Sequence, residues 1–199
     1  MSQNSQSNAQ WANPTPAGLV ALAVACFCFF AMLSGNVTPA AVPLLGCWLL
    51  GGFVIQLIVG LLDLKSNNGT GGNTFLFFAA FFMLVGGLEM LLKFNFGLQN
   101  VPLDARIDGW AWSALALVLL MWTPAFFKTP LPLIAIVILL DIALPFIALI
   151  DIGILDKSLA IVPAWSLLIA GVIAIYFSGA IIVNTAFGKS VFPIPGPLA

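Results

Sequence analysis

Histidine is absent from this chain of 199 residues, and charged side chains make up only 7% of it, with 6 Lys and Arg and 7 Asp and Glu. Soluble domains carry about 25% charged residues, so this chain has too few charges to cover the surface of a water-soluble domain. The scarcity of Lys and Arg excludes a nucleic-acid-binding protein, which needs a dense basic patch. The lack of histidine excludes a Ser-His-Asp triad and a histidine-ligated metal site within the chain.

Cysteine is also scarce: Cys26, Cys28 and Cys47 each lie within an apolar run. An odd number of cysteines in apolar surroundings is typical of small hydrophobic side chains and not of a disulfide framework. A redox or metal pair at Cys26 and Cys28 would need further ligands, and no candidate stands nearby in the sequence. We therefore expect neither a cofactor nor a metal.

Apolar residues are abundant, at 62% of the chain, which excludes intrinsic disorder. They gather in runs that are each near the ~20 residues a helix needs to cross the hydrocarbon core of a bilayer. Helices and closed barrels are the only structures that satisfy the backbone there. The sequence predicts an all-α, polytopic protein of the lipid bilayer, with six transmembrane helices at residues 17–34, 40–62, 73–92, 110–127, 131–150 and 159–184.

The predicted transmembrane domain, residues 17–184, lies between two tails. Residues 1–16 begin with an uncharged polar segment, which we expect to be disordered, and end in Asn13-Pro14-Thr15-Pro16. Residues 185–199 form the C-terminal tail. Between the helices, residues 65–72 predict a flexible turn, residues 94–109 the longest connector, and residues 128–130 a turn short enough to make its two helices antiparallel neighbours.

The distribution of positive charge encodes the orientation only weakly. With six spans, both tails lie on one side together with Lys65, Lys128 and Lys189, while the other side has Lys93, Arg106 and Lys157. Four acids on that second side, Asp104, Asp108, Asp151 and Asp156, favour its facing outward. The sequence predicts a multi-pass protein of a cell or plasma membrane, with both termini inside.

Four stretches of the chain carry motifs of one family, in the family's order. Their sequences are NPTPAGL at residues 13–19, QLIVGLLDLK at 56–65, GNTF at 72–75 and NTAFGKSVFPI at 184–194. They are similar to the N-P-A-P-L-G-L, Q-x-x-x-G-x-x-E, G-N-T-F and F-G-[RK]-x-x-x-P motifs of the acetate uptake transporters, also called the succinate–acetate permease family. The chain thus resembles that family over nearly its whole length.

The resemblance implies a six-helix protomer that assembles as a homo-hexamer, with one pathway through each protomer. It also implies acetate, and related small carboxylates such as succinate, as the substrates, carried by proton-coupled symport or by channel-like anion conduction. The chain departs from the family in an insertion between Lys65 and Gly72 and in the Phe- and Leu-rich stretch of residues 76–83. A tyrosine that the family places near its pore constriction is replaced by Met83. These departures bear on the choice of substrate more than on the fold.

Several polar residues are candidates for the substrate pathway. Pro14 and Pro16 stand where the first helix begins, and together with Asn13 they leave backbone N–H groups free to replace the water around a carboxylate. Asn73 and Thr74 are expected to do the same at the start of the third helix. For both motifs, helix capping is the alternative interpretation. Gln56 lies deep in the second run, and either an interhelical hydrogen bond or a pore role would explain it.

Asp141 lies near the middle of the fifth apolar run. A charge at that depth costs about 2.5–3.5 kcal/mol, so this side chain should face the bundle or a water path. It either lines the pathway, where its protonation would affect the passage of an anion, or is a structural residue. An apolar constriction that closes by dewetting is the other expected feature, with Leu22, Phe75 and Met83 as candidates.

The function predicted from the sequence is a membrane transporter or channel for acetate and related small carboxylates. An amide or urea channel with six helices is the first alternative, in which Asp141 would be structural. A non-transporting structural subunit of a membrane complex is the second. An enzyme is not expected, because the sequence has no catalytic histidine, no Ser–Lys pair and no paired intramembrane Asp.

Overall fold

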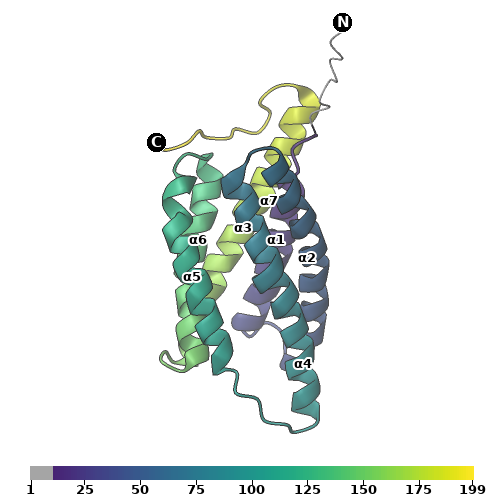
Figure 1. Cartoon of the computed structure of the whole chain (residues 1–199), viewed down its shortest axis with the longest axis vertical. Helices are drawn as coiled ribbons and strands as arrows, with labels where there is room; N and C mark the ends of the chain where they lie inside the picture. Colours follow the sequence, from purple (N-terminus) through teal and green to yellow (C-terminus); the bar gives the residue numbers. More distant parts are fainter. Residues whose placement is uncertain (1–10) are drawn as a thin grey trace, which may run out of the picture.

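A computed structural model describes residues 11–199 and is helical throughout its ordered elements. The expected disorder of the first residues falls on 1–10, which lie outside the described part. The helices are α1 (Thr15–Leu33), α2 (Val42–Lys65), α3 (Gly69–Phe77), the π-helix η2 (Phe78–Val85), α4 (Gly86–Leu98), α5 (Arg106–Phe126), α6 (Leu131–Ile152) and α7 (Ile161–Phe187). Two short 3₁₀ turns, η1 (Pro39–Ala41) and η3 (Lys157–Ala160), precede α2 and α7 (Figure 1).

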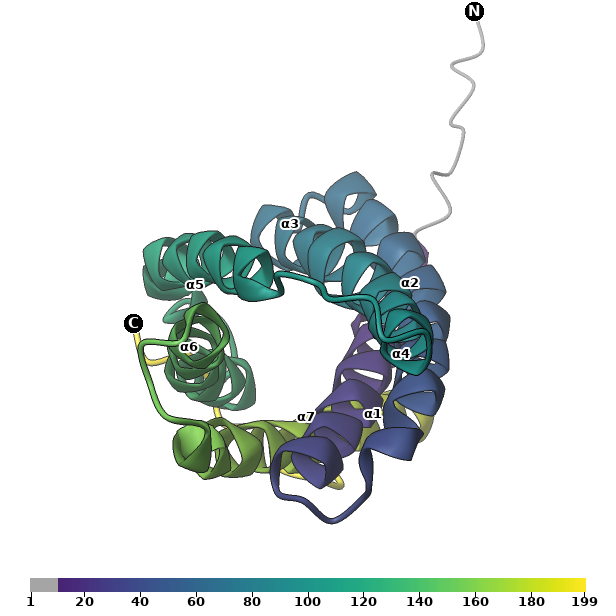
Figure 2. The same cartoon turned by 90° about the horizontal axis from the view of Figure 1, so that it is seen from below.

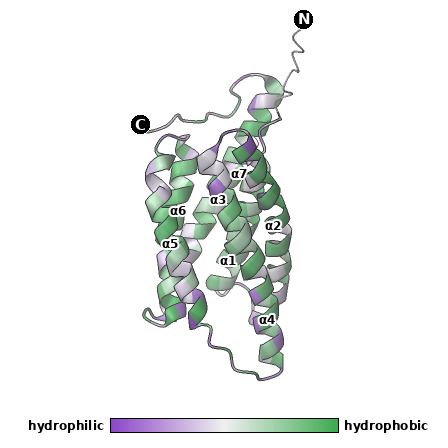
Figure 3. Cartoon of the chain, viewed as in Figure 1, coloured by the Kyte–Doolittle hydropathy of each residue, from purple (hydrophilic) through white to green (hydrophobic). Residues whose placement is uncertain are grey.

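Six helical segments in the described residues are long and apolar enough to cross a membrane. The third of them is continuous from α3 through η2 to α4, Gly69–Leu98. Apolar residues extend along the whole length of these segments, as the green colour of Figure 3 shows. The predicted all-α membrane fold with six transmembrane helices is confirmed, and the chain is a multi-pass membrane protein.

The third span begins earlier and ends later than the sequence predicted. The side chain of Asn68 accepts a hydrogen bond from the Gly71 N–H (3.0 Å) and caps α3, so the helix begins at Gly69. The flexible turn therefore shortens to residues 66–68, where Asn67 has a φ of +61°. Asn73 and Thr74 lie inside α3 and not at its cap, which corrects their predicted position.

The six spans form a ring when the molecule is viewed along its long axis (Figure 2). The order around the ring is α1, α2, the third span, α5, α6 and α7, and α7 packs against α1. Small residues bring α2 close to α4, since a Cβ on Gly46 would lie 2.8 Å from the main-chain oxygen of Gly87. Aromatic side chains close the ring between the third span and α5.

Two aromatic pairs make that closure. The rings of Phe77 and Trp122 have centroids 5.6 Å apart, and those of Phe82 and Trp112 also lie 5.6 Å apart. Both pairs have the edge-on geometry that favours the ring quadrupoles. The two spans thus meet through large side chains, with little direct contact between their backbones.

Charged residues gather at the end of the bundle away from the chain termini. Lys93 on α4 pairs with Glu89 one turn before it (3.6 Å) and with Asp108 on α5. The first of these is the i,i+4 arrangement that is common on helices, and the second joins the third span to α5. Arg106, the first residue of α5, pairs with Asp104 on the preceding connector and lowers the pKa of that carboxyl to about 2.

The C-terminal segment, residues 188–199, crosses from the end of α7 to the turn between α5 and α6 (Figure 1). The Asn184 side chain accepts hydrogen bonds from the Val191 and Phe192 N–H groups and donates one to the Phe192 oxygen. Further along, the Leu131 N–H donates to the Pro195 oxygen (3.1 Å). This segment, called the C-terminal strap below, therefore links three helices at one end of the bundle.

Candidate functional site

A cavity of about 330 Å³ opens at the end of the bundle where α1 begins and α7 ends. Its volume falls in the range of small-molecule sites, about 300–1,000 Å³. All of its walls come from the half of the bundle nearest that end. The residues lining it are Asn13, Thr15, Leu19, Leu22, Gln56, Asp63, Asn68, Thr70, Gly71, Thr74, Phe75, Phe78, Phe126, Lys128, Thr129, Pro130, Leu133, Ile136, Val137, Leu140, Phe177 and Ile181.

The mouth of the cavity is formed by the ends of several helices and includes one lysine. Thr15 begins α1, Thr70 lies in the first turn of α3, and Pro130 is the residue that precedes α6, so the N-terminal ends of these helices converge on the mouth. The N-terminal end of a helix carries a partial positive charge and the C-terminal end a partial negative one. Two C-terminal ends also reach the cavity, α2 at Asp63 and α5 at Phe126. Lys128 adds a full positive charge there, and none of the ion pairs in the described residues includes it.

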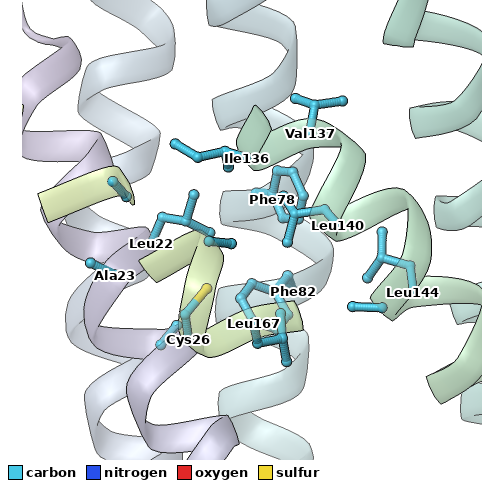
Figure 4. Packing of buried hydrophobic residues seen from close by; sticks show 14 of the residues in the cluster. Leu22, Ala23, Cys26, Phe78, Phe82, Ile136, Val137, Leu140, Leu144 and Leu167 are labelled. Carbon is cyan, nitrogen blue, oxygen red and sulfur yellow. The ribbon is translucent and has the colours of Figure 1, made fainter. Parts of the chain in front are cut away.

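The inner end of the cavity is apolar. Leu22 on α1, Phe78 on η2 and Leu140 on α6 line it and are all buried. Figure 4 shows these side chains pointing toward one another in the interior of the ring. Beyond them the ring is filled, by Cys26, Phe29, Phe82, Leu144 and Leu167 among others. A polar solute that entered from the mouth would therefore meet a closed apolar barrier about midway through the bundle.

Two oxygen atoms on α2 face this cavity without a hydrogen-bond partner. Gln56 is 1% exposed and its amide nitrogen donates to the Gly18 oxygen at 3.5 Å, while its Oε1 has no partner. Asp63 is 2% exposed and its Oδ2 has no partner. Residues seven apart lie on the same face of a helix, and both of these residues line the cavity. Buried acceptors without donors are uncommon and are typical of sites that bind a ligand or water.

Half of the pathway residues predicted from the sequence line this cavity. Those five are Asn13, Leu22, Gln56, Thr74 and Phe75. Asp63 was not among the candidates, although its place in the Q-x-x-x-G-x-x-E-like stretch was the signal that could have identified it. Pro14, Pro16, Asn73, Met83 and Asp141 are absent from the lining. The pathway role of all ten stays a prediction.

The residues outside the lining have other neighbours. The main-chain oxygen of Pro16 accepts a hydrogen bond from the Ser178 hydroxyl (3.0 Å), which ties α1 to α7. Asn73 is exposed, and its amide donates to the Gly69 oxygen one turn before it (2.7 Å). Met83 is fully buried against α2, where a Cβ on Gly52 would lie 2.8 Å from its sulfur.

Asp141 faces α5 and not the cavity. The Thr123 hydroxyl on α5 lies 2.6 Å from Asp141 Oδ2, whereas the neighbouring residue Leu140 is the one that lines the cavity. Residues 11–199 hold no group of three His, Cys, Asp or Glu side chains with metal-binding geometry. The site is therefore built from hydrogen-bonding groups and apolar walls, with Lys128 as the cation at its mouth.

No protein-family model and no curated protein sequence matches the chain. A solved structure does match it: the bacterial acetate channel SatP, with a TM-score of 0.80. The two chains are 23% identical, and the match covers 92% of this chain and 99% of that chain. With so high a structural similarity over nearly the full length of both chains, this protein has the fold of the bacterial acetate channel SatP.

Proposed function

We propose that this protein is a membrane channel or transporter for acetate and related small carboxylates, and that it belongs to the acetate uptake transporter family. The observation that carries the proposal is the cavity, whose mouth joins three helix N-termini with Lys128 and whose inner end is closed by Leu22, Phe78 and Leu140. The motif resemblance and the shared fold with an acetate channel support the same substrate class.

The mouth suits the chemistry of a small anion. A carboxylate that leaves bulk water needs its charge balanced, and helix N-termini and a lysine supply that balance without a deep binding pocket. The apolar walls suit the short alkyl part of acetate, while a dicarboxylate such as succinate would bring a second charge to the Leu22–Phe78–Leu140 barrier. Acetate-like monocarboxylates are therefore the substrates we favour over succinate.

Several finer features belong to the proposal on the strength of the family resemblance. These are a homo-hexamer with one pathway in each protomer, both termini on the inner side of a cell or plasma membrane, and proton coupling of the flux. The beginning of α1 and the end of α7 lie at the same end of the bundle, which agrees with termini on a common side. The proposed activity is transport without catalysis.

An amide or urea channel is the second candidate function, and Gln56 is the observation that favours it. Its unpartnered Oε1 is an acceptor, which pairs with an N–H donor of urea and not with a carboxylate oxygen. A neutral substrate would make no use of Lys128 or of the three helix N-termini. Because these groups surround the mouth, we place the carboxylate first.

Uptake of labelled acetate into liposomes that contain the purified protein tests the proposal. The rate should exceed that of protein-free liposomes, rise with the amount of protein, and fall when unlabelled propionate competes. An Asn13→Ala variant should transport more slowly, because Asn13 lines the mouth and its side-chain oxygen accepts the Thr15 N–H (3.0 Å). Uptake equal to that of protein-free liposomes would refute the proposal.

A further inference from the structure

Asp141 and Thr123 form a polar contact between α6 and α5, within the membrane-spanning part of the chain. The Thr123 hydroxyl oxygen lies 2.6 Å from Asp141 Oδ2 and 2.9 Å from the main-chain oxygen of Leu119. The other carboxyl oxygen, Oδ1, is buried without a partner. Within residues 11–199, Thr123 is the only side chain that bonds Asp141, and the ion pairs of this part of the chain all lie elsewhere.

The number of hydrogen atoms at this contact depends on the protonation of Asp141. A threonine hydroxyl has one hydrogen, and a carboxylate has none. With Asp141 ionised, three oxygen atoms would share the single hydrogen of Thr123, and one of the two contacts would bring two lone pairs together. With Asp141 protonated, the acid donates to Thr123 Oγ1 and Thr123 donates to the Leu119 oxygen. Both contacts then contain a hydrogen.

The unpartnered Oδ1 atom also favours the protonated form of Asp141. An ionised carboxylate would place half of its negative charge on an oxygen that has no donor, in a region where an unpaired charge is costly. In the neutral acid the same atom is a carbonyl oxygen, whose lack of a donor costs far less. The 2.6 Å separation fits a hydrogen bond donated by either Thr123 or Asp141. The protonation state of Asp141 is therefore inferred from the number of hydrogen atoms at the contact and from the unpartnered Oδ1.

We infer that Asp141 is held as a neutral carboxylic acid that donates a hydrogen bond to Thr123, and that this bond fixes the rotation of α6 against α5. Leu140, the next residue before Asp141, points into the ring beside Phe78 (Figure 4). A fixed rotation of α6 therefore sets how far Leu140 reaches into the apolar barrier. Asp141 acts as a positioning residue for the barrier and does not itself meet the substrate.

Infrared difference spectra between the parent and Asp141→Asn test the protonation state, and they do so whatever the protein transports. The variant should lose the carbonyl band of a protonated acid, and Thr123→Val should shift that band. Asp156→Asn is the matched control, because hydrogen bonding to Ser158 lowers the pKa of Asp156. That control should lose a carboxylate band. Loss of a carboxylate band in Asp141→Asn would overturn the inference.

Selectivity measurements test the positioning role, which rests on the proposed function. The ratio of acetate to butyrate uptake should be unchanged in Asp141→Asn, because the amide still donates to Thr123, and in Thr123→Ser, which keeps the hydroxyl. In Asp141→Leu the uptake ratio should change by about threefold or more, because this variant loses the hydrogen bond to Thr123 and a factor of that size corresponds to the net free energy of one hydrogen bond. An Asp141→Leu ratio equal to that of the parent would refute the positioning role. If neither the parent protein nor any variant carried acetate, the proposed function would be refuted, while the infrared test of the protonation state of Asp141 would still hold.

Discussion

Gln56 and Asp63 lie seven residues apart on one face of α2 and line the same cavity, and each has a side-chain oxygen without a hydrogen-bond partner in residues 11–199. Both side chains are nearly inaccessible, at 1% and 2% exposure. The remaining walls of the inner cavity are mostly leucine, isoleucine, valine and phenylalanine. Both oxygens are acceptors, so they favour a solute that carries a hydrogen-bond donor, Gln56 among the apolar walls and Asp63 in the last turn of α2 near the mouth.

Replacing Gln56 by Leu should slow transport by about tenfold, because the protonated acid form of the substrate can donate a hydrogen bond to Gln56 Oε1, and losing a hydrogen bond to a buried group costs about 1–3 kcal/mol. Initial rates of acetate uptake in liposomes measure the effect. Gln99→Leu is the matched control, because Gln99 is an exposed amide that bonds only Asn95 at the other end of the bundle (2.9 Å). Equal rates in the Gln56 variant and its control would remove Gln56 from the pathway.

Neutralising Lys128 with Gln should lower the uptake of acetate and weaken its dependence on ionic strength. Lys128 lines the mouth, and the attraction between its charge and an anion is screened by salt. Lys189→Gln serves as the control, because this exposed lysine follows α7 at the same end of the bundle and does not line the cavity. The account expects uptake to fall in the first variant alone, and an equal fall in both would assign the effect to net charge.

Gly18→Ala should displace Phe75 and alter the cavity. A Cβ at Gly18 would lie 2.5 Å from a ring atom of Phe75, which lines the cavity from α3. Such overpacking typically costs about 1–3 kcal/mol, which thermal unfolding in detergent would detect. Gly51→Ala adds the same methyl group on α2, where nothing lies within 4 Å. Comparable melting temperatures for the two variants would contradict the close contact.

Asn184→Ala should release the C-terminal strap, because the variant loses three hydrogen bonds between the end of α7 and residues 191–192. Limited proteolysis should then cut residues 188–199 faster than in the parent. Asn36→Ala is a suitable control, since Asn36 is exposed and makes no side-chain hydrogen bond. Cleavage at the parent rate would show that the strap is held by other contacts, such as the Tyr176 hydroxyl on the Pro193 oxygen (2.7 Å).

The number and order of the spans could be predicted from the sequence because a helix must be long and apolar to cross a bilayer, whatever its neighbours are. The beginning of the third span could not, because it depends on the local cap that Asn68 makes with Gly71. The π-helical geometry of Phe78–Val85 could not be predicted from hydropathy either, because every residue of this stretch is apolar. The positions that the structure buries in this stretch are Phe78, Ala79, Phe82 and Met83.

A polar residue in an apolar run could be recognised from the sequence, but whether its side chain lies on the helix face that lines the cavity could not. Gln56 was predicted because a polar amide stands out in an apolar run, and it does line the cavity. Asp141 stands out in the same way, yet the rotation of α6 turns it toward Thr123. That rotation depends on packing between helices, which the composition of one helix does not encode.

The ratio of acetate uptake to urea uptake by liposomes containing the purified protein distinguishes a carboxylate channel from an amide or urea channel. The same preparation measured with both labelled solutes cancels differences in protein content and liposome size. We expect uptake of acetate well above that of protein-free liposomes, and uptake of urea at the level of those liposomes, because Lys128 and the helix N-termini at the mouth serve an anion. Fast urea uptake with acetate at the protein-free level would contradict it.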